Sequence, residues 1–147
     1  MKILIANDHR GIKLKNKLQN YLIKSNYTVE NLGTDTKESV DYPTLAFTLS
    51  EKINNDTLGI LICGTGIGMS IAANKVKGIR CAKVSNVHEA RLCREHNNAN
   101  VIAISSNLST IKAKKIIKNF IETKFSNDDR HQKRINIIED YERGNHA

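Results

Sequence analysis

A cysteine stands directly before a run of alternate glycines near the middle of the chain. Cys63 ends an apolar segment and is followed by the glycine-rich loop 64–70. Glycines allow backbone N–H groups to point inward and approach an anion closely, and thiols beside such amides have lowered pKa values. A thiolate can take a proton from carbon, and the amides can bind the oxyanion that forms. The pattern therefore indicates a candidate base beside a candidate oxyanion site.

The glycine loop by itself does not identify a ligand. No Lys-Ser or Lys-Thr pair follows the glycines, as a P-loop requires, and about 20 residues on Cys81-Ala82-Lys83 stands where a dinucleotide fold carries an acid. Free cysteines are also common at the ends of buried strands. Two interpretations of Cys63 thus stay equally open, a catalytic thiol and a packing residue. Cys81 and Cys93 lack such a setting, and we interpret both as packing residues.

Three other groups of polar residues are candidates for chemistry. Asp8 and His9 follow the first apolar segment. His96 has the residue type that passes protons at neutral pH, although exposed loops also carry such histidines. Arg130 and Arg134 lie four residues apart and would share one helix face, where two guanidinium groups suit a phosphate dianion. Arginines on a solvated helix surface have the same spacing, so the pair alone is not specific.

Apolar runs and amphipathic segments alternate along the chain and predict the elements that position these residues. Continuous apolar runs are typical of strands in a parallel sheet, and apolar residues three or four apart are typical of helices. Strands are expected at residues 2–7, 27–32, 58–63, 80–84 and 101–104. Helices are expected at residues 11–25, from Asp41-Tyr42-Pro43 to about 53, 69–76, after an Asn86–Glu89 capping box, 109–124 and 128–142.

This alternation predicts an α/β fold, namely a three-layer αβα Rossmann-like fold with a five-stranded parallel sheet and an extra C-terminal helix. Its length suits a single domain over residues 1–147. Ligands of such sheets bind beyond the C-terminal ends of the strands. Asp8, His9 and Cys63 lie at those ends, as do residues near Ser85 and Ser105. The fold therefore gathers these candidates at one edge of the sheet.

Composition narrows the classes of partner. The formal net charge is +8, but the lysines recur at helical spacing among apolar residues and no nucleic-acid-binding motif accompanies them. We therefore expect solvated helix faces and an anionic small ligand. The N-terminal segment reaches an acid too early for a signal peptide, and three widely spaced cysteines make a poor disulfide framework. These features predict a cytoplasmic protein that binds neither nucleic acid nor membranes.

The motifs along the chain closely resemble those of the type B ribose-5-phosphate isomerases, which form one sugar-phosphate isomerase family with the galactose-6-phosphate isomerase subunits. The resemblance covers nearly the whole chain. Separate motifs in one order are far more specific than a single glycine loop. They are Asp8-His9, Asp41-Tyr42-Pro43, Ile60-Leu61-Ile62-Cys63-Gly64-Thr65-Gly66-Ile67-Gly68, Ser70-Ile71-Ala72-Ala73-Asn74-Lys75, Glu95-His96-Asn97-Asn98-Ala99-Asn100-Val101 and Arg130-His131-Gln132-Lys133-Arg134.

The resemblance implies interconversion of ribose 5-phosphate and ribulose 5-phosphate, in the non-oxidative pentose phosphate pathway, with no metal or coenzyme. It implies that Cys63 moves a proton between C2 and C1, that Thr65 handles hydroxyl protons, and that His96 opens the sugar ring with help from Asp8. The substrate-binding residues that it implies are His9, Arg130 and Arg134 at the phosphate, Asn97 at hydroxyls, Tyr42 along the pocket, and Gly64, Gly66, Ile67, Gly68 and Ser70 as backbone donors. His131, between the two arginines, is a further candidate.

The resemblance also implies a homodimer, or a dimer of dimers, with an active site shared between chains. His96 and Asn97 would reach the Cys63 pocket of a second copy, and the last helix would embrace that copy. The partners it implies are therefore a small sugar phosphate and another copy of the chain.

One position departs from the family pattern. After the fifth strand the family reads Gly-Ser-Arg or Gly-Ala-Arg, with an arginine that helps to bind phosphate, and this chain reads Ser105-Ser106-Asn107. Asn107 carries no charge, and Lys112 or Arg94 are candidates to replace the arginine. The departure leaves an isomerase of a six-carbon sugar phosphate, such as allose or galactose 6-phosphate, as an alternative. A separate hypothesis is a non-catalytic phosphate-binding module on the same fold.

Overall fold

The computed structural model describes residues 1–144 and has the α/β architecture that the sequence predicts. Over these residues, five strands form one all-parallel sheet in the order β2-β1-β3-β5-β4. The strands are β1 (Lys2–Asn7), β2 (Thr28–Asn31), β3 (Thr57–Cys63), β4 (Cys81–Lys83) and β5 (Val101–Ser105). The helices are α1 (Ile12–Lys24), α2 (Tyr42–Glu51), α3 (Ile67–Ala73), α4 (Val87–Asn97), α5 (Thr110–Glu122) and α6 (Asp129–Glu142). The predicted fold class and C-terminal helix are confirmed.

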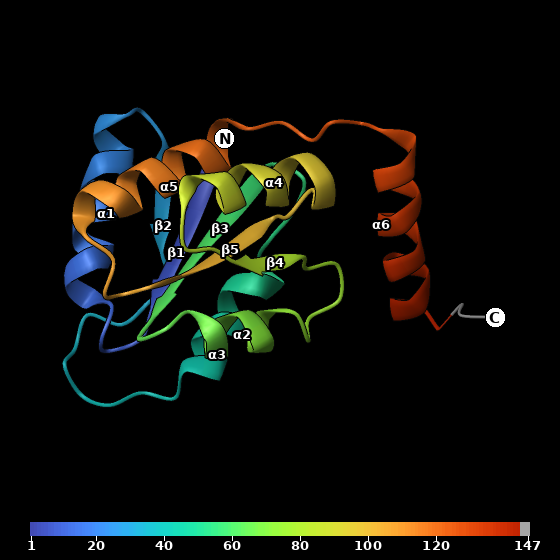
Figure 1. Ribbon diagram of the computed structural model, residues 1–147. Helices are drawn as coiled ribbons and strands as arrows, with labels where there is room; N and C mark the ends of the chain where they lie inside the picture. The colour runs from blue at the N-terminus through green and yellow to red at the C-terminus, as the bar shows by residue number, and fades with distance from the viewer. Residues whose placement is uncertain (145–147) are drawn as a thin grey trace.

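Two sets of helices cover the two faces of the sheet, and they make a three-layer structure (Figure 1). Helices α1, α4 and α5 pack on one face, and α2 and α3 pack on the other. Successive side chains of a strand point to opposite faces. On β3, Ile60 and Ile62 therefore join the first core, whereas Leu61 and Cys63 join the second. The Cys63 side chain thus lies on the α2–α3 face.

Local sequence signals explain where the helices begin. The side chain of Asn86 accepts a hydrogen bond from the Glu89 N–H (2.8 Å) and Glu89 accepts one from the Ser85 N–H (2.7 Å), which confirms the predicted cap of α4. Helix α3 spans Ile67–Ala73 instead of the expected 69–76. It begins earlier because Gly66, with φ of 82°, turns the chain directly from the strand end into the helix.

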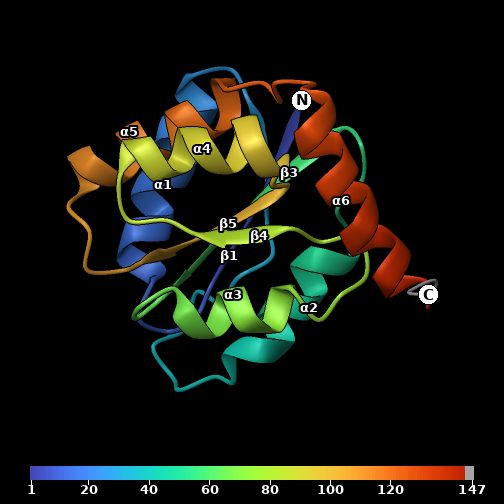
Figure 2. The same ribbon diagram turned by 45° about the vertical axis from the view of Figure 1, so that its right-hand side comes forward.

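Helix α6 stands beside the main body, joined to α5 by residues 123–128 (Figure 2). Its buried residues are His131 and Ile135, whereas Ile137 and Ile138 are 58% and 48% exposed. Among residues 1–144, none of the helices combines the length and the apolar character that crossing a bilayer would need.

A buried lysine ties α1 to the segment that precedes α2. The side chain of Lys15 is fully buried, and its ammonium group pairs with the Asp35 carboxylate. Asn31 donates a second hydrogen bond to that carboxylate at 3.2 Å. Because Lys15 lies inside the protein, Asp35 supplies the counter-charge that this burial requires.

We expect Asp35→Ala to lower the free energy of unfolding by about 1–3 kcal/mol near neutral pH, because the buried ammonium loses its partner. The hydrogen bond from Lys15 lowers the pKa of Asp35 below 3.8. The stabilisation is therefore complete above that pH and is lost as the pH falls through the lower pKa of the folded state. Urea denaturation between about pH 7 and pH 2 measures this, with Asp56→Ala as the control. A difference between wild type and variant that does not narrow in acid would contradict the assignment.

Candidate active site

The thiol of Cys63 lies at the C-terminal end of β3, where the chain turns into the glycine loop. The Gly66 N–H donates a hydrogen bond to its Sγ at 3.2 Å. Gly66 adopts a left-handed conformation, and a Cβ there would lie 3.0 Å from the carbonyl carbon of Ile104. Only glycine fits this turn, and the turn aims an amide at the sulfur.

A cavity of about 620 Å³ opens in front of this thiol. Its lining comes from the loops after β1 and β3, from the segment before α2 and from α3, at the edge of the sheet that the sequence analysis expected. The lining residues are Asp8, His9, Arg10, Ser39, Val40, Tyr42, Cys63, Gly64, Thr65, Ile67, Gly68 and Ile71. Eight of the predicted site residues therefore meet in one cavity.

Asp8 and His9 are held by backbone groups. The carboxylate of Asp8 accepts hydrogen bonds from the N–H groups of Arg10 (3.0 Å) and Gly11 (3.2 Å). Nδ1 of His9 accepts one from the Val40 N–H at 3.3 Å, so its proton sits on Nε2 when the ring is neutral. Both side chains also line the cavity. His9 also fixes the segment before α2 against the end of β1.

Tyr42 lies across Gly68 at the mouth of the cavity. A Cβ on Gly68 would come within 2.5 Å of the tyrosine ring, so a larger residue there would displace the Tyr42 side chain. The hydroxyl oxygen of Thr65 accepts a hydrogen bond from the Ile67 N–H at 3.2 Å. Ser70 is not among the lining residues of the cavity. Gly66 acts from behind the cavity through its bond to Cys63.

Arg10 lines the cavity although the sequence analysis did not single it out. Its guanidinium group lies over Gly64, where a Cβ would come within 2.9 Å of Nη1. The signal in the sequence was an arginine directly after Asp8 and His9, at the end of a buried strand. A charged residue at that place points toward the ligand edge of a parallel sheet.

Five other predicted residues lie at the opposite edge of the sheet, namely His96, Asn97, Arg130, His131 and Arg134. His96 and Asn97 end α4, which leads into the N-terminal end of β5. In the parallel register, Gly59 pairs with Val101 and Cys63 with Ser105. At about 3.3 Å per residue, four residues of strand place this edge roughly 13 Å from the Cys63 edge. One chain therefore does not bring His96 to its own Cys63.

His96 stacks on His131 of α6, with ring centroids 4.5 Å apart and the planes inclined by 19°. Burial of the His131 ring, followed by the neighbouring His96 and Arg130, lowers the pKa of His131 below 6.5. The ring pair joins α6 to the end of α4. His131, for which the sequence suggested no definite role, is therefore a neighbour of His96.

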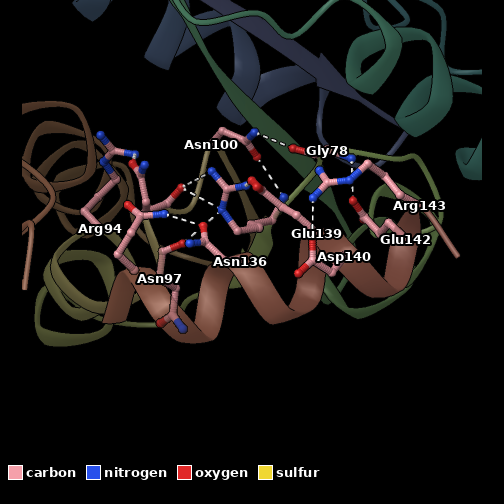
Figure 3. Close-up of polar contacts among 12 residues, drawn as sticks. Gly78, Arg94, Asn97, Asn100, Asn136, Glu139, Asp140, Glu142 and Arg143 are labelled. Atoms are coloured by element: carbon pink, nitrogen blue, oxygen red, sulfur yellow. Dashed lines mark hydrogen bonds and ion pairs between the residues drawn. The ribbon is translucent and has the colours of Figure 1, made fainter. Parts of the chain in front are cut away.

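Polar contacts along α6 fix the helix beside the loops at this same edge (Figure 3). The carboxylate of Glu142 accepts a hydrogen bond from the Gly78 N–H (3.0 Å), and Glu139 pairs with Arg80 (3.2 Å). Arg130 and Arg134 are exposed on this helix, and Arg130 forms an ion pair with Asp128 at 3.5 Å. Both arginines thus share a helix, as predicted, but they are remote from the Cys63 cavity of their own chain.

Asn107 lies beside the glycine loop, in the turn after β5. The hydroxyl of Ser105 donates to the Gly64 carbonyl (2.7 Å) and accepts from the Asn107 N–H (3.1 Å), so it joins the two turns. The guanidinium group of Arg94 does not reach this place. It bonds the carbonyls of Ala99 and Thr123 near the opposite edge, so Arg94 does not replace the missing arginine.

The other two thiols have surroundings unlike that of Cys63. Burial raises the pKa of Cys81 to about 12 and that of Cys93 to about 11. Both therefore stay protonated near neutral pH, as expected of packing residues. Among residues 1–144, no group of three or more His, Cys, Asp or Glu side chains is arranged to hold a metal ion.

Known proteins resemble this chain in both sequence and structure. Residues 3–138 match the family described as Ribose/Galactose Isomerase. The Bacillus subtilis protein YwlF, whose name specifies a sugar phosphate isomerase but no particular sugar, is 43% identical and covers 99% of both chains. Ribose-5-phosphate isomerase B of Mycolicibacterium paratuberculosis is 37% identical, over 100% of this chain and 95% of its own.

A solved structure of ribose-5-phosphate isomerase B from Mycoplasma genitalium, with bound ribulose-5-phosphate, has a TM-score of 0.92 and 41% identity. The match covers 97% of this chain and 96% of that one. Similarity of this extent includes the sheet, the glycine loop and the C-terminal helix together. The chain therefore belongs to the ribose/galactose isomerase family of sugar phosphate isomerases.

Proposed function

We propose that the protein interconverts ribose 5-phosphate and ribulose 5-phosphate through an enediolate. The observation that carries this proposal is the Cys63 thiol, which faces a cavity of about 620 Å³ and accepts a hydrogen bond from the Gly66 N–H. A thiol held in this way suits a base that takes a proton from carbon. The Mycoplasma genitalium relative with bound ribulose-5-phosphate supports a pentose phosphate as substrate.

In the proposed reaction, the Cys63 thiolate removes the C2 proton of the open-chain aldose. The electron pair of that bond forms the C1–C2 double bond, and the carbonyl oxygen becomes the oxyanion of an enediolate. Backbone N–H groups of the glycine loop stabilise this charge. Thr65, which lines the same cavity, passes the hydroxyl proton from O2 toward O1. Return of the proton from Cys63 to C1 yields the ketose.

Ring opening needs a second group, because the substrate is mainly a cyclic furanose in water. We assign this step to His96 of a second copy, with Asp8 holding the sugar end, because His96 lies on the edge remote from its own Cys63. Histidine passes protons to and from oxygen at neutral pH. Asn97 of the same copy would bind hydroxyl groups.

The proposed assembly is a homodimer, or a dimer of dimers, in which α6 of one chain packs against the other. Two observations support it. Ile137 and Ile138 are exposed on α6, and exposed apolar faces mark contact surfaces. Arg130 and Arg134 are also exposed on that helix, and the substrate phosphate is proposed to lie between them and His9 of the other chain.

We expect kcat/KM for ribose 5-phosphate to exceed kcat/KM for allose 6-phosphate and galactose 6-phosphate by at least about tenfold, because one added carbon must fit the same pocket. Ketose formation from each purified sugar phosphate measures the ratio. A hexose preference would replace the pentose assignment with the six-carbon alternative. No conversion of any sugar phosphate would favour the binding module instead.

A further inference from the structure

Arg10 has an unpaired guanidinium group between two cavities. It lines the Cys63 cavity and also a neighbouring cavity of about 510 Å³ that Asn107 borders. Its side chain makes no hydrogen bond or ion pair with any residue in the described range 1–144. A guanidinium group that lines a cavity and has no protein partner is free to bind an anion.

The charge balance around Arg10 favours a substrate anion. Arg10 is the one permanently charged cation that lines the Cys63 cavity within the described part of the chain. The one acidic residue lining the Cys63 cavity in the described chain is Asp8, whose carboxylate is held by the N–H groups of Arg10 and Gly11. The neighbouring cavity adds Lys13 and Lys17, and no acidic residue among residues 1–144 lines it. Asn107 brings no charge, although arginine is expected at that position from the resemblance.

The backbone around Arg10 holds it in place. Its N–H is bonded to the Asp8 carboxylate at 3.0 Å, and its side chain rests on Gly64, where a Cβ would collide with Nη1. Position 10 follows β1 and position 107 follows β5, yet both reach the same cavity. An arginine at either position, 10 or 107, would therefore place its guanidinium group in this cavity.

We propose that Arg10 binds the substrate phosphate together with His9 of the same chain, and that it takes the place of an arginine at position 107. This inference rests on the proposed function. Arg10 contacts the phosphate from the same chain, and the arginines of α6 contact it from the other. Because a phosphate contact is shared by the ground state and the transition state, Arg10 affects KM and leaves kcat nearly unchanged.

The test uses the Arg10→Ala variant of the full chain. We expect its KM for ribose 5-phosphate, and the Ki of inorganic phosphate as a competitive inhibitor, to rise by about 10- to 100-fold, with kcat within about threefold of wild type. Arg91→Ala is the matched control, because Arg91 is an exposed arginine that bonds Asn119 on α5. We expect its KM and Ki to stay at the wild-type values.

A second variant separates phosphate binding from a structural role. Arg10→Ala/Asn107→Arg returns a guanidinium group to the same cavity from the other turn, and we expect it to recover most of the lost phosphate affinity. A structural role of Arg10 on Gly64 would not be rescued from position 107. Failure of this rescue, or a loss in Arg10→Ala that falls on kcat alone, would overturn the assignment.

A direct measurement of phosphate binding tests the role of Arg10 independently of isomerase activity. If the wild-type chain converts no sugar phosphate, the isomerase proposal fails, and titration calorimetry with inorganic phosphate still tests Arg10. Weaker phosphate binding in Arg10→Ala than in Arg91→Ala would support the assignment. Equal binding in the two variants, or no phosphate binding by the wild type, would overturn it.

Discussion

We expect the replacement of Cys63 by alanine to lower kcat for ribose 5-phosphate by about 10²–10⁴-fold, the range typical for loss of a general base. No other titratable sulfur lines this cavity within residues 1–144. Burial raises the pKa of Cys81 to about 12, so that thiol does not take over the step. Initial rates of ketose formation measure the loss. Proton exchange between C2 of the substrate and deuterated water should fall by the same factor, because it reports the same proton transfer.

The control for this prediction is Cys81→Ala, which removes a thiol of the same type outside the Cys63 cavity. We expect it to keep the wild-type kcat. Cys63→Ala should also keep the fold and its affinity for inorganic phosphate, because the groups proposed to bind phosphate are untouched. Activity that survives Cys63→Ala would make the base assignment wrong. Loss of phosphate binding in that variant would mean that the substitution damages the whole site.

Two inactive variants should restore activity when their chains are combined. Cys63→Ala and His96→Ala are each expected to lose at least about 10²-fold in kcat, the second for loss of the ring-opening group. If sites are shared between chains, a mixed dimer contains one site with both residues intact and one with neither. Random pairing makes half of the dimers mixed, so about a quarter of the wild-type activity returns.

Co-expression with two different affinity tags provides the mixed dimer, and successive purification on both tags isolates it. The isolated species should reach about half of the wild-type activity, since one of its two sites is complete. The control combines Cys63→Ala with Thr65→Ala. Both changes lie in the same cavity, and every site then lacks one of the two residues. Complementation by this control pair, or none by the first pair, would contradict a shared site.

The fold could be predicted from the sequence because its signals are local. The apolar run of β3 is buried along its whole length, and the Asn86–Glu89 cap begins α4 as expected. Strands and helices that alternate have few ways to pack, and parallel strands place their C-terminal ends at one edge. For the same reason Asp8, His9 and Cys63 could be assigned to one cavity before any contact was known.

The sequence by itself determined the α/β fold, the glycine loop at the end of β3 and the family. Only the tertiary structure decided which permanently charged cation of the described chain lines the Cys63 cavity. Arg10 follows β1 and Asn107 follows β5, and both line one cavity. Residues so far apart in the chain are brought together by the packing of the strands, which the spacing of neighbouring residues does not reveal. The same holds for His96. His96 precedes the N-terminal end of β5, whereas Cys63 pairs with Ser105 at the C-terminal end of that strand. The length of β5 therefore separates the two residues.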